Sequence, residues 1–126
     1  MLFRSFGNQD AQGLHLFAED EAVIAMLIAE VLTGLGHSIC ASVMTADDAV
    51  TAAHQHHPDL IIADAGLRDS SGVEAIATIR KTANIPHVFM SGNVAGVLAL
   101  RPDAVVIEKP FHEAELVDAM ARAIIA

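Results

Sequence analysis

Short apolar runs alternate along the chain with longer stretches in which apolar residues recur every three or four positions. Short continuous runs are typical of strands buried on both faces, whereas the longer spacing is typical of helices that pack on one side. The short runs predict strands at 14–18, 39–43, 60–63, 86–90 and 104–107. The periodic stretches predict helices from residue 22 to the glycines at 34 and 36, from residue 45 to before residue 58, at 73–81, at 93–100, and from about residue 112 onward.

Five alternations of strand and helix predict an α/β protein with a flavodoxin-like fold. Such a fold is a doubly wound, five-stranded parallel sheet in the order 2-1-3-4-5, with helices on both faces. Thr45 and Asp48 form a Thr-x-x-Asp pattern, which satisfies free amide groups at a helix start. The helix at 93–100 contains Gly96, so we expect it to be short and comparatively mobile.

The length of 126 residues is enough for one domain with a substantial core. Residues 1–13 have mixed polarity and no period, which predicts a flexible N-terminal arm before a domain at 14–126. The net charge is −9 and the seven Lys and Arg residues are scattered, which argues against a nucleic-acid partner. No secretory signal and no apolar run of membrane-spanning length is visible in the sequence, so we expect a cytoplasmic protein without membrane contact.

Polar side chains follow four of the predicted strands. Glu19 and Asp20 follow the first, Asp64 the third, Ser91 the fourth and Lys109 the fifth. Because the carboxyl ends of parallel strands line one crevice, these residues are expected to converge. Clustered carboxylates repel one another unless a cation is present, and oxygen ligands suit Mg²⁺. Carboxylates, a hydroxyl and an ammonium group beside such an ion form a set suited to phosphoryl transfer.

The segments around these residues resemble the receiver domain of bacterial two-component response regulators. The matching segments are Phe-Ala-Glu-Asp-Glu at 17–21, Leu-Ile-Ile-Ala-Asp at 60–64, Val-Phe-Met-Ser-Gly at 88–92 and Glu-Lys-Pro-Phe at 108–111. Gly72 also stands where the family has a glycine after its phosphorylated loop. The resemblance extends from Leu14 to Ala126 and implies a phosphorelay signalling protein that catalyses only its own phosphorylation and dephosphorylation.

The resemblance implies specific roles at the acidic end of the crevice. Asp64 is expected to accept the phosphoryl group as an aspartyl phosphate. Asp20 is expected to ligate Mg²⁺ directly, Glu19 to act on the ion through water, and the Gly66 carbonyl to complete the protein's ligands. Mn²⁺ is the expected substitute for Mg²⁺.

Other roles implied by the resemblance concern the phosphate contacts and the switch. Ser91 is the expected switch hydroxyl and Lys109 the expected phosphate contact, with Pro110 following through a cis peptide bond. Val106 occupies the position on the fifth strand where the family often has a Tyr or Phe that swings inward on activation. No Tyr or Phe is therefore available at this position for that readout.

The segment Pro-His-Val-Phe-Met-Ser-Gly-Asn at 86–93 is similar to the Pro-Phe-x-Phe-Ala-Thr-Gly-Tyr signature of a receiver subgroup common in alphaproteobacteria, known as FAT GUY. Phe89, Ser91 and Gly92 fit that signature, whereas His87, Met90 and Asn93 do not. The subgroup implies a stand-alone regulator that is typically paired with a kinase of the HWE or a related class. The expected partner is therefore a sensor histidine kinase or a histidine phosphotransfer protein. We expect the protein to signal by contact with another protein or by transfer of the phosphoryl group. A homodimer is compatible with this family.

The first predicted helix is apolar nearly all round, with Val23 and Met26 on its surplus face. This face either docks the helix pair of a histidine phosphotransfer partner, as in the receiver family, or is partly buried by neighbouring loops. Two histidines, His87 and His112, are expected near the mouth of the crevice.

Two rival functions are compatible with parts of the sequence. One is a phosphate-independent adaptor that keeps the receiver fold, which Val106 favours and the complete set of site residues opposes. Magnesium binding separates the two. The other is a phosphatase with an aspartate nucleophile. Such enzymes usually need an acid–base aspartate two residues beyond the nucleophile, where this chain has Gly66.

Overall fold

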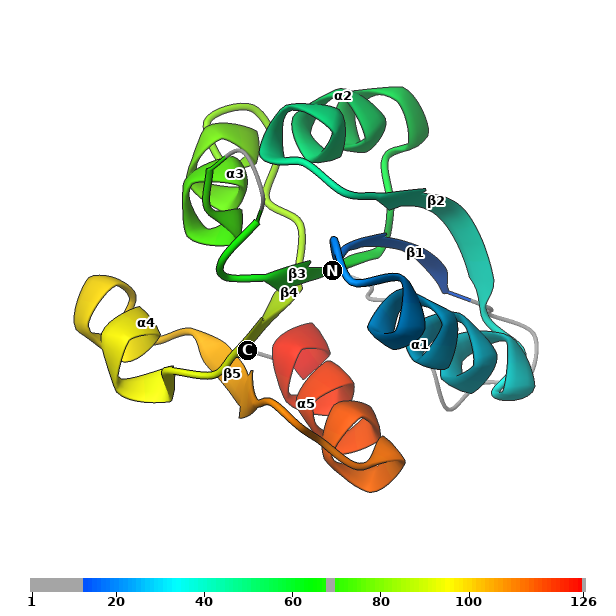
Figure 1. Ribbon diagram of the computed structural model, residues 1–126. Coiled ribbons are helices and arrows are strands. Elements are labelled where there is room, and N and C mark those ends of the chain that lie inside the picture. The colour runs from blue at the N-terminus through cyan, green and yellow to red at the C-terminus, as the bar shows by residue number, and fades with distance from the viewer. Residues whose placement is uncertain (1–12, 68–69, 126) are drawn as a thin grey trace.

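The computed structural model describes residues 13–67 and 70–125, along which five strands and five helices alternate (Figure 1). The strands are β1 (Leu14–Ala18), β2 (Ser38–Val43), β3 (Leu60–Asp64), β4 (His87–Ser91) and β5 (Val105–Glu108). The helices are α1 (Ala22–Gly34), α2 (Ala46–His56), α3 (Gly72–Ile79), α4 (Val94–Leu100) and α5 (Glu113–Ile125). Except for Gly13, the expected N-terminal arm lies outside the described residues.

All four strand pairs are parallel and the sheet order is β2-β1-β3-β4-β5, which confirms the predicted topology. From β1 the chain moves outward to β2, and after β3 it moves outward in the other direction to β5. The two directions separate between β1 and β3, and a crevice forms at the carboxyl ends of the strands at such a point. The register aligns those ends, with Asp64 beside Met90 and Ser91 beside Glu108.

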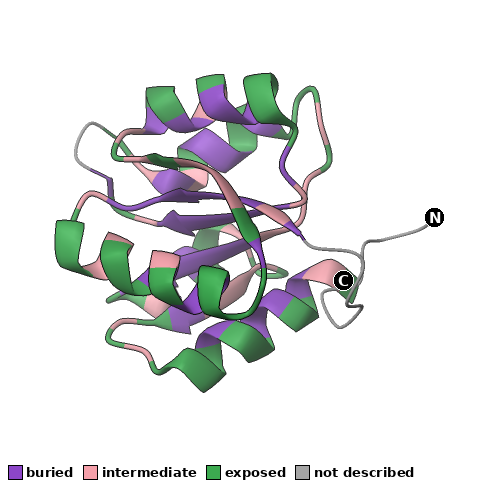
Figure 2. Ribbon diagram, turned by 90° about the vertical axis from the view of Figure 1, so that its right-hand side faces the viewer, coloured by how far each residue is buried: buried purple, intermediate pink, exposed green. Residues whose placement is uncertain are grey.

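Two apolar clusters cover the faces of the sheet (Figure 2). Along a strand, successive side chains point to opposite faces, so the two clusters share each central strand. Leu16 and Ile61 belong to the cluster with α2, α3 and α4, whereas Phe17 and Ile62 belong to the cluster with α1 and α5. Strands buried on both faces have room for few polar side chains, which confines the polar residues to the strand ends.

The helix ends follow local rules. The Thr45 side chain accepts a hydrogen bond from the Asp48 amide at 3.1 Å, as the sequence predicts. Ser71 caps α3 in the same way through the Glu74 amide at 3.0 Å, so this helix begins at residue 72 rather than 73. After α1 the chain turns at Gly36, whose φ of 89° favours glycine.

The expected strand at 86–90 is displaced by one residue because Pro86 has no amide hydrogen to donate, although its carbonyl oxygen accepts from Ile61. Helix α4 has seven residues and is short, as expected. Among the described residues, no helix is both long and apolar enough to cross a bilayer.

Helix α1 presents apolar side chains to solvent. Val23 is 79% exposed and Met26 is 63% exposed, whereas Ile28 on the opposite face is fully buried. Of the two alternatives for this surplus face, burial by neighbouring loops is therefore wrong, and the face is free to contact a partner.

Candidate functional site

The polar residues that follow the strands meet at one edge of the sheet. Glu19 and Asp64 are almost fully buried there, with 1% and 6% of their surfaces exposed, and Ser91 is 8% exposed. Asp20 and Lys109 are half-buried at the rim. The structure therefore places the five predicted residues at one edge of the sheet, although they lie up to 90 positions apart in the chain.

Three carboxylates form the acidic part of the site. One oxygen from each of Glu19, Asp20 and Asp64 lies within 4.8 Å of the others. Within residues 13–67 and 70–125, no other group of three His, Cys, Asp or Glu residues is placed to hold a metal ion. The ligands are all oxygen atoms, and the rim is open at Asp20, which suits a hard divalent cation that keeps several waters.

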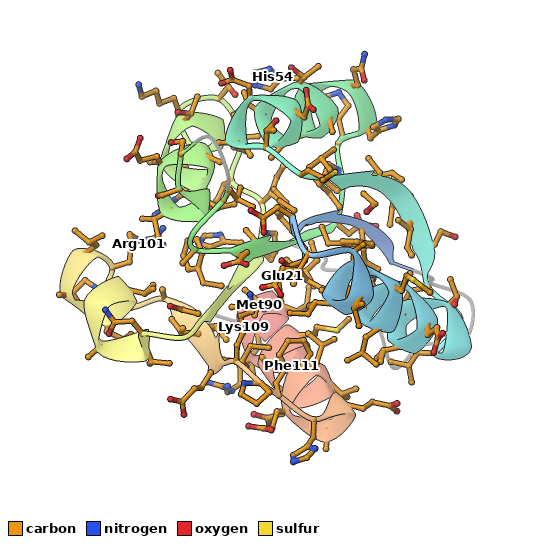
Figure 3. The ribbon with its side chains drawn as sticks, viewed as in Figure 1. Glu21, His54, Met90, Arg101, Lys109 and Phe111 are labelled. Carbon is orange, nitrogen blue, oxygen red and sulfur yellow. The ribbon has the colours of Figure 1, made fainter. Side chains whose placement is uncertain are left out.

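Lys109 contacts two of these three carboxylates and lies close to Glu21 (Figure 3). Its Nζ lies 2.7 Å from Asp64 Oδ2 and 3.4 Å from Glu19 Oε1. Glu21, at the start of α1, approaches the same ammonium group at 3.6 Å. Only 16% of the Lys109 side chain is exposed, so these charge-assisted contacts lie in a partly dry environment where they are strong.

The electrostatics of the site reflect this crowding. Burial, together with the nearby Asp64 charge, raises the pKa of Glu19 to about 7, although the Glu21 amide and Lys109 act in the opposite direction. Burial alone would lower the pKa of Lys109, but the hydrogen bond and charge of Asp64, followed by Glu19, outweigh it and raise that pKa. The site thus holds excess negative charge that one ammonium group balances only in part.

The loop after β3 fixes the Asp64 carboxylate. The Gly66 amide donates to Asp64 Oδ1 at 3.0 Å, which leaves Oδ2 for Lys109. Gly72 donates its amide to the Ala65 carbonyl at 2.9 Å, so the start of α3 packs directly on this loop. A side chain at Gly72 would meet the main chain of Asp64. Resemblance alone pointed to a glycine at this position, and the close contact with Asp64 is the physical reason why no side chain fits there.

Ser91 occupies the end of β4 beside the carboxylates. Its Oγ accepts a hydrogen bond from the Asn93 amide at 2.8 Å, and its carbonyl oxygen accepts from the Lys109 amide at 2.9 Å. The second contact ties the end of β4 to the residue that reaches Asp64. With Oγ acting as an acceptor toward Asn93, the hydroxyl proton remains available for donation to another group.

Comparison with known proteins identifies the family. Residues 16–121 match the model of the response regulator receiver domain. Over 113 residues the chain is 35% identical to the phyllosphere-induced regulator PhyR of Methylorubrum extorquens, covering 86% of this chain and 42% of that protein. It is 33% identical over 113 residues to the transcriptional regulatory protein PdtaR of Mycobacterium tuberculosis, covering 86% and 55%. The PhyR response regulator REC domain of Erythrobacter litoralis superimposes with a TM-score of 0.83 at 29% identity, covering 90% and 91%.

The chain belongs to the response regulator receiver domain family. It is thus a receiver domain of two-component signalling, and its similarity to PhyR supports the alphaproteobacterial type expected from the sequence. The chain spans about half the length of the curated relatives it matches.

Two positions of this receiver domain bear on its switching. The Lys109–Pro110 peptide bond is cis, the form that the family resemblance implied. Val106 is half-buried on β5 beside Phe89 of β4, and both contact the cluster under α2, α3 and α4. The large aromatic side chain in this part of the receiver domain is therefore the fully buried Phe89, on the neighbouring strand.

The structure corrects one residue and adds another. His87 does not lie near the crevice mouth as expected, because it begins β4 and the crevice forms where that strand ends. Glu21 contacts Lys109, whereas the sequence analysis gave it no role of its own. The sequence signal for this contact was the position of Glu21 one residue after Asp20. That signal is not specific, because carboxylates are common at helix starts, where the helix dipole favours them.

Proposed function

We propose that this receiver domain accepts a phosphoryl group on Asp64 in a Mg²⁺-dependent phosphorelay. The observation that carries the proposal is the contact of 2.7 Å between Lys109 Nζ and Asp64 Oδ2, beside two further carboxylates. A buried aspartate held by an ammonium group and facing an acidic cluster is arranged for attack on phosphorus, with charge stabilisation already in place.

The donor set fits a magnesium ion. Glu19, Asp20 and Asp64 offer oxygen atoms within 4.8 Å of one another, and the raised pKa of buried Glu19 indicates excess negative charge that a cation relieves. By resemblance, the Gly66 carbonyl completes the protein's ligands, and Mn²⁺ substitutes for Mg²⁺. When bound, the ion neutralises charge on the oxygens of the transferring phosphoryl group.

The residues of this chain have distinct parts in the transfer. An Asp64 oxygen bonds to phosphorus while the phosphorus–nitrogen bond of a phosphohistidine breaks, and the electron pair leaves with the imidazole nitrogen. The Gly66 amide keeps the carboxylate oriented. Lys109 follows the negative charge from the carboxylate to the phosphoryl oxygens, and the Ser91 hydroxyl donates to one of them. In a separate step, water attacks the phosphorus of the aspartyl phosphate, which releases inorganic phosphate and restores the Asp64 carboxylate.

The phosphoryl donor in this proposal is a sensor histidine kinase or a histidine phosphotransfer protein, of the HWE class by resemblance. The exposed Val23 and Met26 of α1 support docking of such a partner, since they lie in the first turns of the helix that begins two residues after Asp20. Output follows by protein contact or by passing the phosphoryl group on.

The test is the intact mass of the protein after incubation with acetyl phosphate and Mg²⁺. One added phosphoryl group is expected, and Asp64→Asn or added EDTA abolishes it. Asp118→Asn is the matched control, because it neutralises an exposed carboxylate that pairs only with Arg122 on α5 in the described structure.

The rival function is a phosphate-independent adaptor, and the observation that favours it is Val106 in place of the switching aromatic residue. Beryllofluoride forms a stable mimic of an aspartyl phosphate and decides between the two. Mg²⁺-dependent beryllofluoride binding without a mass adduct indicates a short-lived phosphoryl group. Absence of both the adduct and beryllofluoride binding refutes phosphorylation and favours the adaptor.

A further inference from the structure

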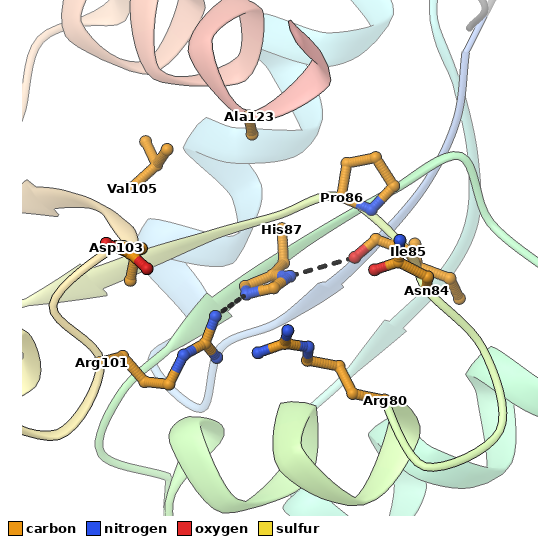
Figure 4. Close-up of a pocket in the computed structure, with 10 residues that line it drawn as sticks. Arg80, Asn84, Ile85, Pro86, His87, Arg101, Asp103, Val105 and Ala123 are labelled. Atoms are coloured by element: carbon orange, nitrogen blue, oxygen red, sulfur yellow. Dashed lines mark hydrogen bonds between the residues drawn. The ribbon is translucent and has the colours of Figure 1, made fainter. Parts of the chain in front are cut away.

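A second polar cavity lies at the edge of the sheet opposite the acidic crevice (Figure 4). It forms where β4 and β5 begin, beside the ends of α3 and α4, and has a volume of about 210 Å³. Its polar lining includes Arg80, His87, Arg101 and Asp103, and we call it the Arg80–Arg101 pocket. None of these residues takes part in the proposed phosphorylation.

The Arg101 side chain is held in place before any ligand arrives. His87 Nδ1 lies 3.0 Å from the Ile85 carbonyl oxygen, which only accepts, so this nitrogen carries the proton. His87 Nε2 is then an acceptor, and Arg101 Nη2 donates to it at 3.1 Å (Figure 4). The Arg101 guanidinium also lies over the Phe89 ring, with 5.8 Å from Cζ to the centroid. Two independent contacts thus fix the guanidinium.

One nitrogen of this fixed guanidinium makes no hydrogen bond within the described structure. Arg101 Nη1 is buried and has no hydrogen-bond partner among the described residues. Burial, followed by the charge of Arg80, lowers the pKa of Arg101, although Asp103 acts in the opposite direction. A buried guanidinium nitrogen without a partner is unfavourable, and an acceptor in the cavity would satisfy it.

The pocket also concentrates positive charge in an acidic protein. Of seven Lys and Arg residues, Arg4 and Arg68 fall outside the described part, which leaves five, and two of those five line this cavity. Figure 4 shows the Arg80 and Arg101 side chains reaching toward each other beneath the His87 ring. Within the described residues, neither forms an ion pair with a carboxylate. Asp103 offsets only part of their charge.

The volume limits the size of a ligand. At about 30 Å³ for each water, 210 Å³ corresponds to about seven waters, well below the space that drug-sized ligands or nucleotides need. We propose that the Arg80–Arg101 pocket binds a small oxyanion, the phosphate or carboxylate group of a low-molecular-weight ligand. Arg101 Nη1 donates to one oxygen, and Arg80 reaches a second from the solvent side.

The test is a titration of the full ¹⁵N-labelled chain with small oxyanions, in which the amide chemical shifts are the readout. Inorganic phosphate is the first probe and succinate the second, which separates a tetrahedral from a planar oxyanion. Sodium chloride keeps the ionic strength constant, and EDTA keeps divalent ions from the acidic crevice. Saturable shifts are expected for the amides of Ile85, His87, Asp103 and Val105, with a dissociation constant on the order of 1 mM for the better probe.

Variants locate the binding site. Arg101→Gln and Arg80→Gln are each expected to weaken binding about tenfold or more, because each removes a charged donor. Arg122→Gln is the matched control, since Arg122 is 51% exposed and pairs with Asp118 on α5, and its affinity is expected to equal that of the wild type. Arg80 is exposed, so its replacement leaves the fold intact even where replacement of Arg101 does not.

Two results overturn the proposal. The first is a set of shifts that stay linear in probe concentration, or that chloride reproduces at equal ionic strength. The second is saturable binding in which the Arg80→Gln variant has the same affinity for the probe as the Arg122→Gln control. Both outcomes are independent of whether Asp64 is phosphorylated, because the readout is the shift of amides around the pocket.

Discussion

Replacing Gly72 by alanine tests whether the start of α3 holds the Asp64 loop in position. A Cβ at this residue would lie 2.9 Å from the Asp64 carbonyl carbon and even closer to its oxygen, and 3.3 Å from the Ala63 side chain. Carbon atoms in contact are normally separated by about 3.5–4.0 Å. The carbonyl carbon alone requires the two segments to move apart by about 0.6–1.1 Å, and the closer oxygen requires more. The obstacle is main chain, which has no rotamer to change.

Gly72→Ala is expected to have two effects, a loss of stability and a loss of function at Asp64. Overpacking typically costs about 1–3 kcal/mol, and a backbone obstacle places Gly72→Ala near the upper value. With a urea m-value of about 1.5 kcal/mol/M, a loss of about 3 kcal/mol lowers the midpoint by about 2 M. Displacement of Asp64 by about 1 Å from Lys109 slows phosphorylation by acetyl phosphate by up to about a hundredfold, a loss typical for misplaced reacting groups. The same displacement weakens beryllofluoride binding.

Urea denaturation followed by circular dichroism measures the first effect, since the chain has no Trp or Tyr for intrinsic fluorescence. Gly34→Ala is the matched control. Its Cβ meets nothing within 4 Å, so the same chemical change in α1 raises stability slightly, by about 0.5 kcal/mol. If Gly72→Ala unfolds within about 0.5 kcal/mol of the wild type and binds beryllofluoride normally, the close approach to Asp64 does not constrain the site.

Three further predictions concern other groups. Lys109→Met lowers the free energy of unfolding by about 3 kcal/mol in EDTA, because it leaves buried carboxylates without their cation, and Mg²⁺ restores part of the loss. His57→Gly raises that free energy by about 1 kcal/mol, since His57 ends α2 with a φ of 48° that glycine adopts more easily. Burial lowers the pKa of His15 to about 3, so the unfolded chain takes up this proton first and the contribution of neutral His15 is lost as the pH falls below about 6.5. His15→Leu therefore gains stability relative to the wild type between pH 6.5 and 5, by about 2 kcal/mol at 1.36 kcal/mol per pH unit. The raised pKa of Glu19 acts with the opposite sign between about pH 4.5 and 7, but it is common to both proteins and leaves their difference unchanged.

Chemical and thermal denaturation with matched variants checks these predictions. Lys81→Met removes an exposed ammonium group and is expected to be neutral. Equal losses for Lys81→Met and Lys109→Met would contradict the role of the buried contacts. His56→Gly lies within α2 and is expected to destabilise, so a gain there would remove the argument from the left-handed conformation of His57. For His15→Leu, a stability difference that does not change with pH would show that the imidazole takes up its proton equally in the folded and unfolded states, so that burial does not lower its pKa.

The sequence alone determined the fold and the membership of the acidic site. Strands buried on both faces must be continuous apolar runs, and each run ends where a polar residue can reach solvent. Asp64 and Ser91 were therefore recognisable by position within their runs, before any contact was known. The start of α2 was equally local, because Thr45 and Asp48 are only three residues apart.

Only the tertiary structure decided the contacts between distant residues. Lys109 and Asp64 lie 45 positions apart, and Arg101 and His87 lie 14 apart across two elements, so no local pattern gives their distances. His87 was misplaced near the crevice mouth, although its position at the start of a predicted parallel strand already puts it at the opposite edge of the sheet. That edge is set by the direction of β4 within the parallel sheet, and the Arg80–Arg101 pocket at the far edge follows from it. Sequence spacing fixes what a residue does within its own helix or strand, whereas packing of the sheet and helices fixes which residues meet.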